Sequence, residues 1–113
     1  MNINSEEQLQ AACYQWFWNT YVSERQMLFH VQQSAWNRVT GSRFKAIGVT
    51  KGVSDLILVL HGRVVFIELK MDTGKQSDSQ KEFEQKVKSR GHSYFICYSL
   101  QAFQNLIGSL LIL

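Results

Sequence analysis

The stretch DLILVLHGRVVFIELK, residues 55–70, contains two apolar runs joined by a short polar connection. Its first run, residues 56–60, is apolar throughout, which is typical of a strand that is buried on both faces. The connection His61-Gly62-Arg63 fits a tight turn, and the second run ends at Lys70. The stretch therefore predicts a β-hairpin with strands at residues 55–60 and 64–70.

Charged residues stand at the ends of both predicted strands. Glu68 and Lys70 are two residues apart, so they point to one face of their strand while Leu69 points to the other. Asp55 opens the antiparallel partner strand, so pairing places it beside Glu68 and Lys70. Burying such groups is costly unless they pair or bind something. This group of side chains indicates either a structural ion pair or a site for Mg²⁺ or Mn²⁺, and the spacing alone leaves both interpretations open.

The sequence on either side of the hairpin predicts helices around one sheet. Apolar residues recur at helical spacing in three segments, residues 4–22, 79–90 and 100–111. Further strands are predicted at residues 27–32 and 94–98. The order α-β-β-β-α-β-α predicts an α/β fold with a mixed central sheet flanked by helices on both faces.

Residues 34–54 show no steady period, and they contain Gly41, Gly48, Gly52 and several basic residues. We predict a long basic loop there, of the kind that often carries function.

Length and composition limit the class of protein. The 113 residues, 45% hydrophobic and 19% charged, fit a single globular domain over residues 1–113 rather than a disordered chain. A net charge of +3 is compatible with a polyanionic partner without identifying one. Cys13 and Cys97 are far apart and without a Cys-x-x-Cys pair, which disfavours a thiolate zinc site and favours a reducing, cytoplasmic compartment.

The two ends of the chain carry no targeting signal that we can identify. The first ten residues are polar, and the longest apolar run near the C-terminus, residues 110–113, is far too short to span a bilayer. We therefore expect an intracellular protein that does not associate with a membrane. We also expect no small-molecule cofactor.

Three segments, taken in order, resemble the PD-(D/E)xK nucleases and within them the VRR-Nuc (virus-type replication-repair nuclease) family. They are GVTKGVSDLI at residues 48–57, FIELK at 66–70 and GKQSDSQ at 74–80. The resemblance covers nearly the whole chain and is closest to small stand-alone members found in bacteriophages. It implies an α/β fold with a restriction-endonuclease-like core. It also implies a Mg²⁺- or Mn²⁺-dependent DNA endonuclease, selective for branched or duplex DNA, in phage replication, recombination or repair.

The resemblance also implies roles for individual residues. Asp55 and Glu68 would be metal ligands, with the backbone carbonyl of Leu69 as a further ligand. Lys70 would be the catalytic lysine and Gln80 a supporting active-site residue.

Some of these implied roles compete with other interpretations. Glu6 matches the glutamate that the family carries on its first helix, and Glu7 is the competing choice. Gln80 also fits a capping box with Ser77. Ser54 stands where family members usually carry proline, so the backbone that leads into Asp55 is expected to be less rigid.

The basic loop supplies candidate DNA contacts. The residues expected to bind phosphates or stack on bases are Arg38, Arg43, Lys45, Lys51 and Trp36. A solvated loop is the competing interpretation. The three histidines lack the spacing of metal ligands and are interpreted as surface or structural residues, although His30 lies near the basic loop.

The assembly and activity of the chain also have alternatives. The apolar last helix and tail predict a homodimer. A non-catalytic nucleic-acid-binding module with the nuclease fold is the alternative to an enzyme, although the intact set of Asp55, Glu68 and Lys70 argues against it.

Overall fold

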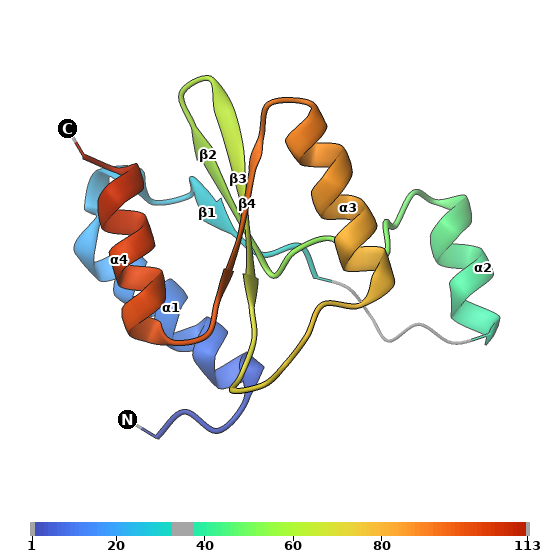
Figure 1. Cartoon of the computed structure of the whole chain (residues 1–113), viewed down its shortest axis with the longest axis horizontal. Coiled ribbons are helices and arrows are strands. Elements are labelled where there is room, and N and C mark those ends of the chain that lie inside the picture. Colours follow the sequence, from blue (N-terminus) through green and yellow to red (C-terminus); the bar gives the residue numbers. More distant parts are fainter. Residues whose placement is uncertain (1, 33–37, 113) are drawn as a thin grey trace.

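The computed structural model describes residues 2–32 and 38–112 (Figure 1). The elements are α1 (Glu6–Thr20), a 3₁₀ turn η1 (Val22–Glu24), β1 (Leu28–Phe29), α2 (Arg38–Ala46), β2 (Leu56–Leu60), β3 (Arg63–Leu69), α3 (Asp78–Ser89), β4 (Ser93–Cys97) and α4 (Leu100–Leu110). The predicted mixed α/β architecture is confirmed, and the predicted elements lie within a few residues of the observed ones.

The sheet has the strand order β1-β2-β3-β4. The predicted hairpin is present, with β2 antiparallel to β3 and the pairs Leu56↔Ile67 and Leu60↔Arg63 near its two ends. β4 runs parallel to β3, so the sheet is mixed. A parallel neighbour requires a crossover, and α3 supplies it between β3 and β4.

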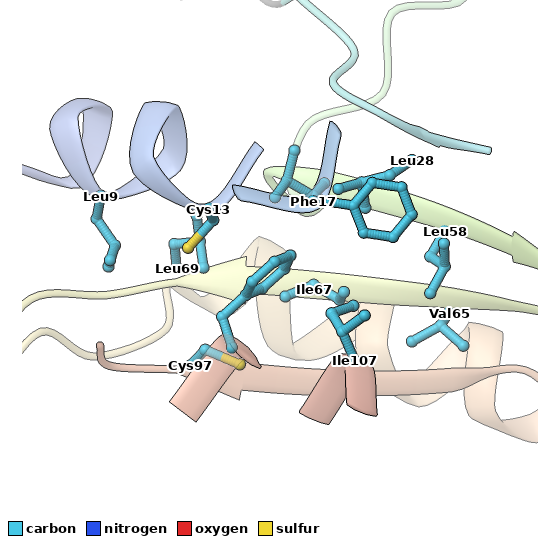
Figure 2. Packing of buried hydrophobic residues seen from close by; sticks show 12 residues of the cluster. Leu9, Cys13, Phe17, Leu28, Leu58, Val65, Ile67, Leu69, Cys97 and Ile107 are labelled. Carbon is cyan, nitrogen blue, oxygen red and sulfur yellow. The ribbon is translucent and has the colours of Figure 1, made fainter. Parts of the chain in front are cut away.

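The apolar core lies between the sheet and the pair of helices α1 and α4. Figure 1 shows these two helices together on one side of the sheet and α3 on the other. Figure 2 shows side chains from α1, the sheet and α4 meeting in this core, among them Leu9, Cys13, Phe17, Ile67, Leu69 and Ile107. Because Ile67 and Leu69 face this core, Glu68 and Lys70 face α3.

The face of the sheet toward α3 carries an aromatic cluster beside the charged residues. The Phe83 ring of α3 packs edge-on against Phe66, with ring centroids 5.1 Å apart, and against Tyr94 at 6.5 Å. These contacts fix α3 over β3 and β4. The first turn of α3 therefore lies near the end of β3, where Glu68 and Lys70 are.

The predicted loop over residues 34–54 is wrong in its middle, because α2 occupies Arg38–Ala46. Figure 1 shows α2 beyond α3, on the side away from α1. The α2 sequence RVTGSRFKA is mostly polar, so it carries no broad apolar stripe that a search for helical periods would detect. The sequence nonetheless contains a glycine, Gly48, that marks the end of this helix. Gly48 has φ +89° and its amide donates to the Lys45 carbonyl, while the Val49 amide donates to Phe44. That pattern is a Schellman helix end.

The predicted strand at residues 27–32 is also too long, since β1 pairs with β2 only through Leu28 and Phe29. The alternating side chains fit a strand, but only Ile57 and Leu58 of β2 have partners on β1.

Candidate active site

Asp55 and Glu68 lie side by side where the hairpin opens. The β2–β3 pairing ends at Leu56↔Ile67, so Asp55 comes just beyond the last pair. Its Oδ2 accepts a hydrogen bond from the Leu69 amide at 2.7 Å, which fixes the carboxyl group at the end of β3. The register of the hairpin thus brings together two carboxylates that are 13 residues apart in sequence.

Glu68 is buried, with 2% of its surface exposed. Burial raises the pKa of its carboxyl group to about 9, and a hydrogen bond with Asp55 and the Asp55 charge act in the same direction. The Lys70 charge and the Tyr94 hydroxyl oppose that rise in pKa. Two carboxyl groups this close require either a shared proton or a cation between them.

Two donors hold the same oxygen of Glu68. Gln80 Nε2 donates to Oε2 at 2.9 Å, and the Tyr94 hydroxyl donates to it at 3.1 Å. The other oxygen, Oε1, can therefore coordinate a cation without breaking these hydrogen bonds. Such outer contacts orient a metal ligand and affect its affinity.

Lys70 is held by an amide rather than by a carboxylate. Its Nζ donates to Gln80 Oε1 at 3.2 Å, and the side chain is nearly buried. By contrast, Glu82–Lys86 and Glu84–Lys88 on α3 are direct ion pairs with N–O distances under 4.0 Å. The ordinary ion-pair interpretation of Lys70 therefore has no direct contact to support it in the part of the chain described.

Gln80 fulfils both of its interpretations at once. It forms the capping box of α3, because its Oε1 accepts from the Ser77 amide at 2.8 Å and its own amide donates to Ser77 Oγ at 3.2 Å. The same side chain bridges Glu68 and Lys70. The helix cap thus fixes the distance between a buried carboxyl group and a buried ammonium group.

Gly52 packs the segment before Asp55 against α3. Its φ is +91°, and a Cβ there would lie 2.5 Å from the Ser79 carbonyl oxygen. Ser54, in the place of the expected proline, is buried and donates its hydroxyl to the Leu56 carbonyl at 3.0 Å. A hydrogen bond and a close backbone contact therefore restrain the approach to Asp55.

Sequence reasoning gave no site role to Tyr94 and interpreted His30 as surface or structural. Tyr94 lies on β4, where the parallel register pairs it with Phe66, two residues before Glu68. His30 Nδ1 lies 2.5 Å from the Asp55 carbonyl oxygen, so the ring donates there and fixes the backbone of Asp55. Neither contact could be found from sequence spacing, since each joins segments at least 25 residues apart.

The remaining predicted residues lie on α1, on α2 or just after it, or outside the described chain. Glu6 and Glu7 are exposed on the first turn of α1, which Ser5 caps. Glu7 lines a cleft together with His30 and Leu56, and Glu6 is not among the residues that line it.

The predicted DNA contacts are distributed around α2. Arg43, Lys45 and Lys51 are exposed on α2 or just after it. Arg38 begins α2, and Trp36 lies outside the described residues.

The donor set fits one divalent cation with oxygen ligands. Among the described residues, no three His, Cys, Asp or Glu side chains cluster closely enough to hold a metal by themselves. Asp55, which is partly buried, and Glu68, which is buried, nevertheless form a carboxyl pair that needs positive charge. Mg²⁺ characteristically uses one or two protein carboxylates and fills its other positions with water or phosphate oxygens.

Comparisons with known proteins agree with this fold. The family model of the VRR-NUC domain matches residues 3–101. A solved structure described as a VRR_NUC domain protein superposes with a TM-score of 0.76 at 19% sequence identity, covering 98% of this chain and 91% of that chain. No curated protein matches the chain significantly. Among the described residues, none of the helices has the length and hydropathy needed to cross a bilayer. Because the family model matches most of its length, this chain belongs to the VRR-NUC domain family.

Proposed function

We propose that this chain is a Mg²⁺- or Mn²⁺-dependent endonuclease that hydrolyses DNA phosphodiester bonds. The observation that carries the proposal is that the buried Glu68 carboxyl group and the partly buried Asp55 carboxyl group lie close to Lys70. The nuclease fold and the family membership support it.

Each residue of the site has a definite task in such a reaction. Asp55 and Glu68 would hold the cation, with the Leu69 carbonyl as a further ligand. The bound cation supplies a water of lowered pKa and positive charge beside the phosphate. Lys70 offers its other N–H donors to the attacking water and the phosphate oxygens, because an ammonium group has three donors and Gln80 takes one. Attack of the water on phosphorus would break the bond to the 3′ oxygen, which would leave as a hydroxyl after gaining a proton from solvent, so that the other end carries a 5′-phosphate.

The surroundings of the site extend the proposal. Glu6 on α1 would be an additional carboxylate of the site. The residues proposed to contact DNA are Arg38, Arg43, Lys45, Lys51 and Trp36. We also propose that residues 1–113 act as one nuclease domain in phage replication, recombination or repair, selective for branched or duplex DNA.

A homodimer would form through α4 and the tail after it. Ile112 is 78% exposed there, at the rim of a cleft of about 450 Å³ that Leu110 and Leu111 also line. The molar mass in solution, measured by light scattering, tests this part independently of activity.

Cleavage of supercoiled plasmid and branched DNA tests the proposal. We expect cleavage by wild type in Mg²⁺ or Mn²⁺, none in EDTA, and loss of cleavage in Asp55→Ala and Lys70→Ala. The matched control is Lys86→Ala, which removes an exposed lysine of α3. Equal activity in all four proteins would overturn the assignment, and salt-dependent binding without cleavage would indicate a non-catalytic DNA-binding module.

A further inference from the structure

A cleft of about 520 Å³ opens between α1 and β1, next to the candidate active site. Its lining comes from the outward face of α1 and from the edge of the sheet. The residues that line it are Glu7, Gln10, Ala11, Tyr14, Gln15, Phe29, His30 and Leu56. The proposed catalytic residues Asp55, Glu68 and Lys70 face α3 and are not part of this lining.

The lining suits an uncharged planar group better than a phosphate. Among the residues that the structure describes, no lysine or arginine lines the cleft, and Glu7 gives it negative charge. Gln10, Gln15 and Glu7 are hydrogen-bonding side chains of the type that pairs with base edges. The Tyr14 ring supplies an aromatic surface, and every nucleobase has a face that can stack on one.

The cleft borders the backbone of Asp55 through His30 and Leu56. Leu56 directly follows Asp55, and the His30 ring that lines the cleft is bonded to the Asp55 carbonyl oxygen. His30 also lines a second hollow of about 190 Å³ with Asp55 and Ser54. A nucleotide next to one whose phosphate lies at Asp55 therefore has this cleft within its reach.

At its other end the cleft leads to an aromatic platform on α1. Tyr14 and Gln15 also line a hollow of about 250 Å³ with Trp18 and Asn19. The rings of Tyr14 and Trp18 are stacked at 30°, with centroids 6.2 Å apart, and Trp18 is 37% exposed. The guanidinium group of Arg25 lies over the Trp18 ring, 4.5 Å from its centroid, so positive charge lies directly against the platform.

We propose that this surface, from His30 through Tyr14 to Trp18 and Arg25, is a track for an unpaired strand of the nucleic acid whose phosphodiester is cut at Asp55 and Glu68. Unpaired bases stack in the cleft and on the Tyr14–Trp18 platform, and Arg25 takes a backbone phosphate beyond it. The track rests on the proposed nuclease function. It gives the enzyme a preference for DNA in which a single strand leaves the duplex beside the scissile bond.

Fluorescence anisotropy in EDTA measures this binding without cleavage. The probes are a labelled oligo(dT) 12-mer, a blunt duplex, and the same duplex with a single-stranded arm. We expect Trp18→Ala to weaken binding of the 12-mer and the armed duplex about 5- to 100-fold, the range for loss of one base stack, and to leave the blunt duplex unchanged. Trp18→Phe should retain most of the wild-type affinity, because a stacking ring remains.

Phe95→Ala is the matched control, since it removes an aromatic ring of similar exposure from β4. A second variant, Tyr14→Leu, keeps an apolar side chain against the core while removing the ring. The inference is overturned if both α1 variants weaken all three probes equally or weaken none. It is also overturned if Trp18→Ala dissociates a dimer without changing DNA binding, because the platform is then a protein contact.

Failure of the nuclease proposal gives a different result. Wild type would then cut no DNA in Mg²⁺ or Mn²⁺, whereas the binding differences between the three probes in EDTA would still report on the track.

Discussion

The hairpin site and helix α2 differ in how the fold holds their polar side chains. At the site, Gln80 of α3 forms hydrogen bonds with both Glu68 and Lys70, and these two side chains lie on the face of the sheet that α3 covers. On α2, Arg43 and Lys45 are exposed, and the helix lies beyond α3 in Figure 1. Chemistry needs fixed geometry, whereas contact with a polyanion needs mainly charge. Substitutions in the first region should therefore change metal binding and rate, and those in the second should change salt-dependent affinity.

The largest effect is expected from Glu68→Gln, which keeps the shape of the side chain and removes its charge. Loss of the metal ligand should reduce cleavage by about 1,000-fold or more, since a bound metal contributes several kcal/mol. Stability in EDTA should hardly change, because the raised pKa of about 9 keeps Glu68 protonated at neutral pH. Cleavage assays and thermal unfolding in EDTA check both parts. A large loss of stability without metal would show that Glu68 is primarily structural.

The pH dependence of metal affinity follows from the same raised pKa. Because Glu68 carries a proton in the metal-free protein below about pH 9, binding a cation must release that proton. Apparent Mg²⁺ affinity should therefore rise by up to about tenfold per pH unit as pH increases toward 9, and level off above it. Calorimetry at three pH values and in two buffers of different protonation enthalpy measures the affinity and the proton release. If the Mg²⁺ affinity of wild type did not change with pH, Glu68 would not be protonated in the metal-free protein. Glu68→Gln is the control, because its side chain has no carboxyl proton to release.

Tyr94→Phe removes the hydroxyl group that donates a hydrogen bond to Glu68 Oε2. We expect metal affinity to fall about 10- to 100-fold, the usual cost of losing an outer hydrogen bond. The ring packing against Phe83 should be preserved. The matched control is Tyr98→Phe, whose exposed hydroxyl reaches only the Gly74 carbonyl at 3.4 Å. Equal metal affinity in both variants would remove Tyr94 from the site.

Gly52→Ala tests the packing that joins the Asp55 segment to α3. The added Cβ meets the Ser79 carbonyl at 2.5 Å in a backbone with positive φ, so we expect a loss of about 2–4 kcal/mol of stability and weaker metal binding. Gly48→Ala is the control, because its φ is also positive but nothing lies within 4 Å of the added atom. It should cost only about 1 kcal/mol. Denaturant unfolding compares the two, and similar losses would mean that the contact with α3 is unimportant.

The smallest effect is expected from Arg43→Ala and Lys45→Ala on α2. Each should weaken DNA binding by a similar factor for all sequences and reduce the slope of log affinity against log salt by about 1. Metal affinity measured without DNA should stay at the wild-type value. A change in metal affinity would show that α2 and the site are not separate, and an unchanged salt slope would remove α2 from the DNA contact.

Short-range patterns in the sequence determine the hairpin, the strand faces and the cap of α3. Alternation along the strand places Glu68 and Lys70 on one face, and the short turn at Gly62 brings Asp55 opposite them. The capping box of Ser77 and Gln80 was visible from its spacing of three residues. These features depend on neighbours in the chain or on one tight turn, so their geometry follows from the sequence.

Tertiary structure decided the contacts that complete the site. The parallel register of β4 brings Tyr94 to Glu68, and the docking of β1 brings His30 to Asp55. The fold also decided that Lys70 is held by Gln80, and that the segment once expected to be all loop contains α2. Such outcomes depend on how distant elements pack. A periodic pattern in the sequence does not predict these contacts. It fixes the face of the strand or helix on which a side chain lies, but not which distant residue that side chain contacts.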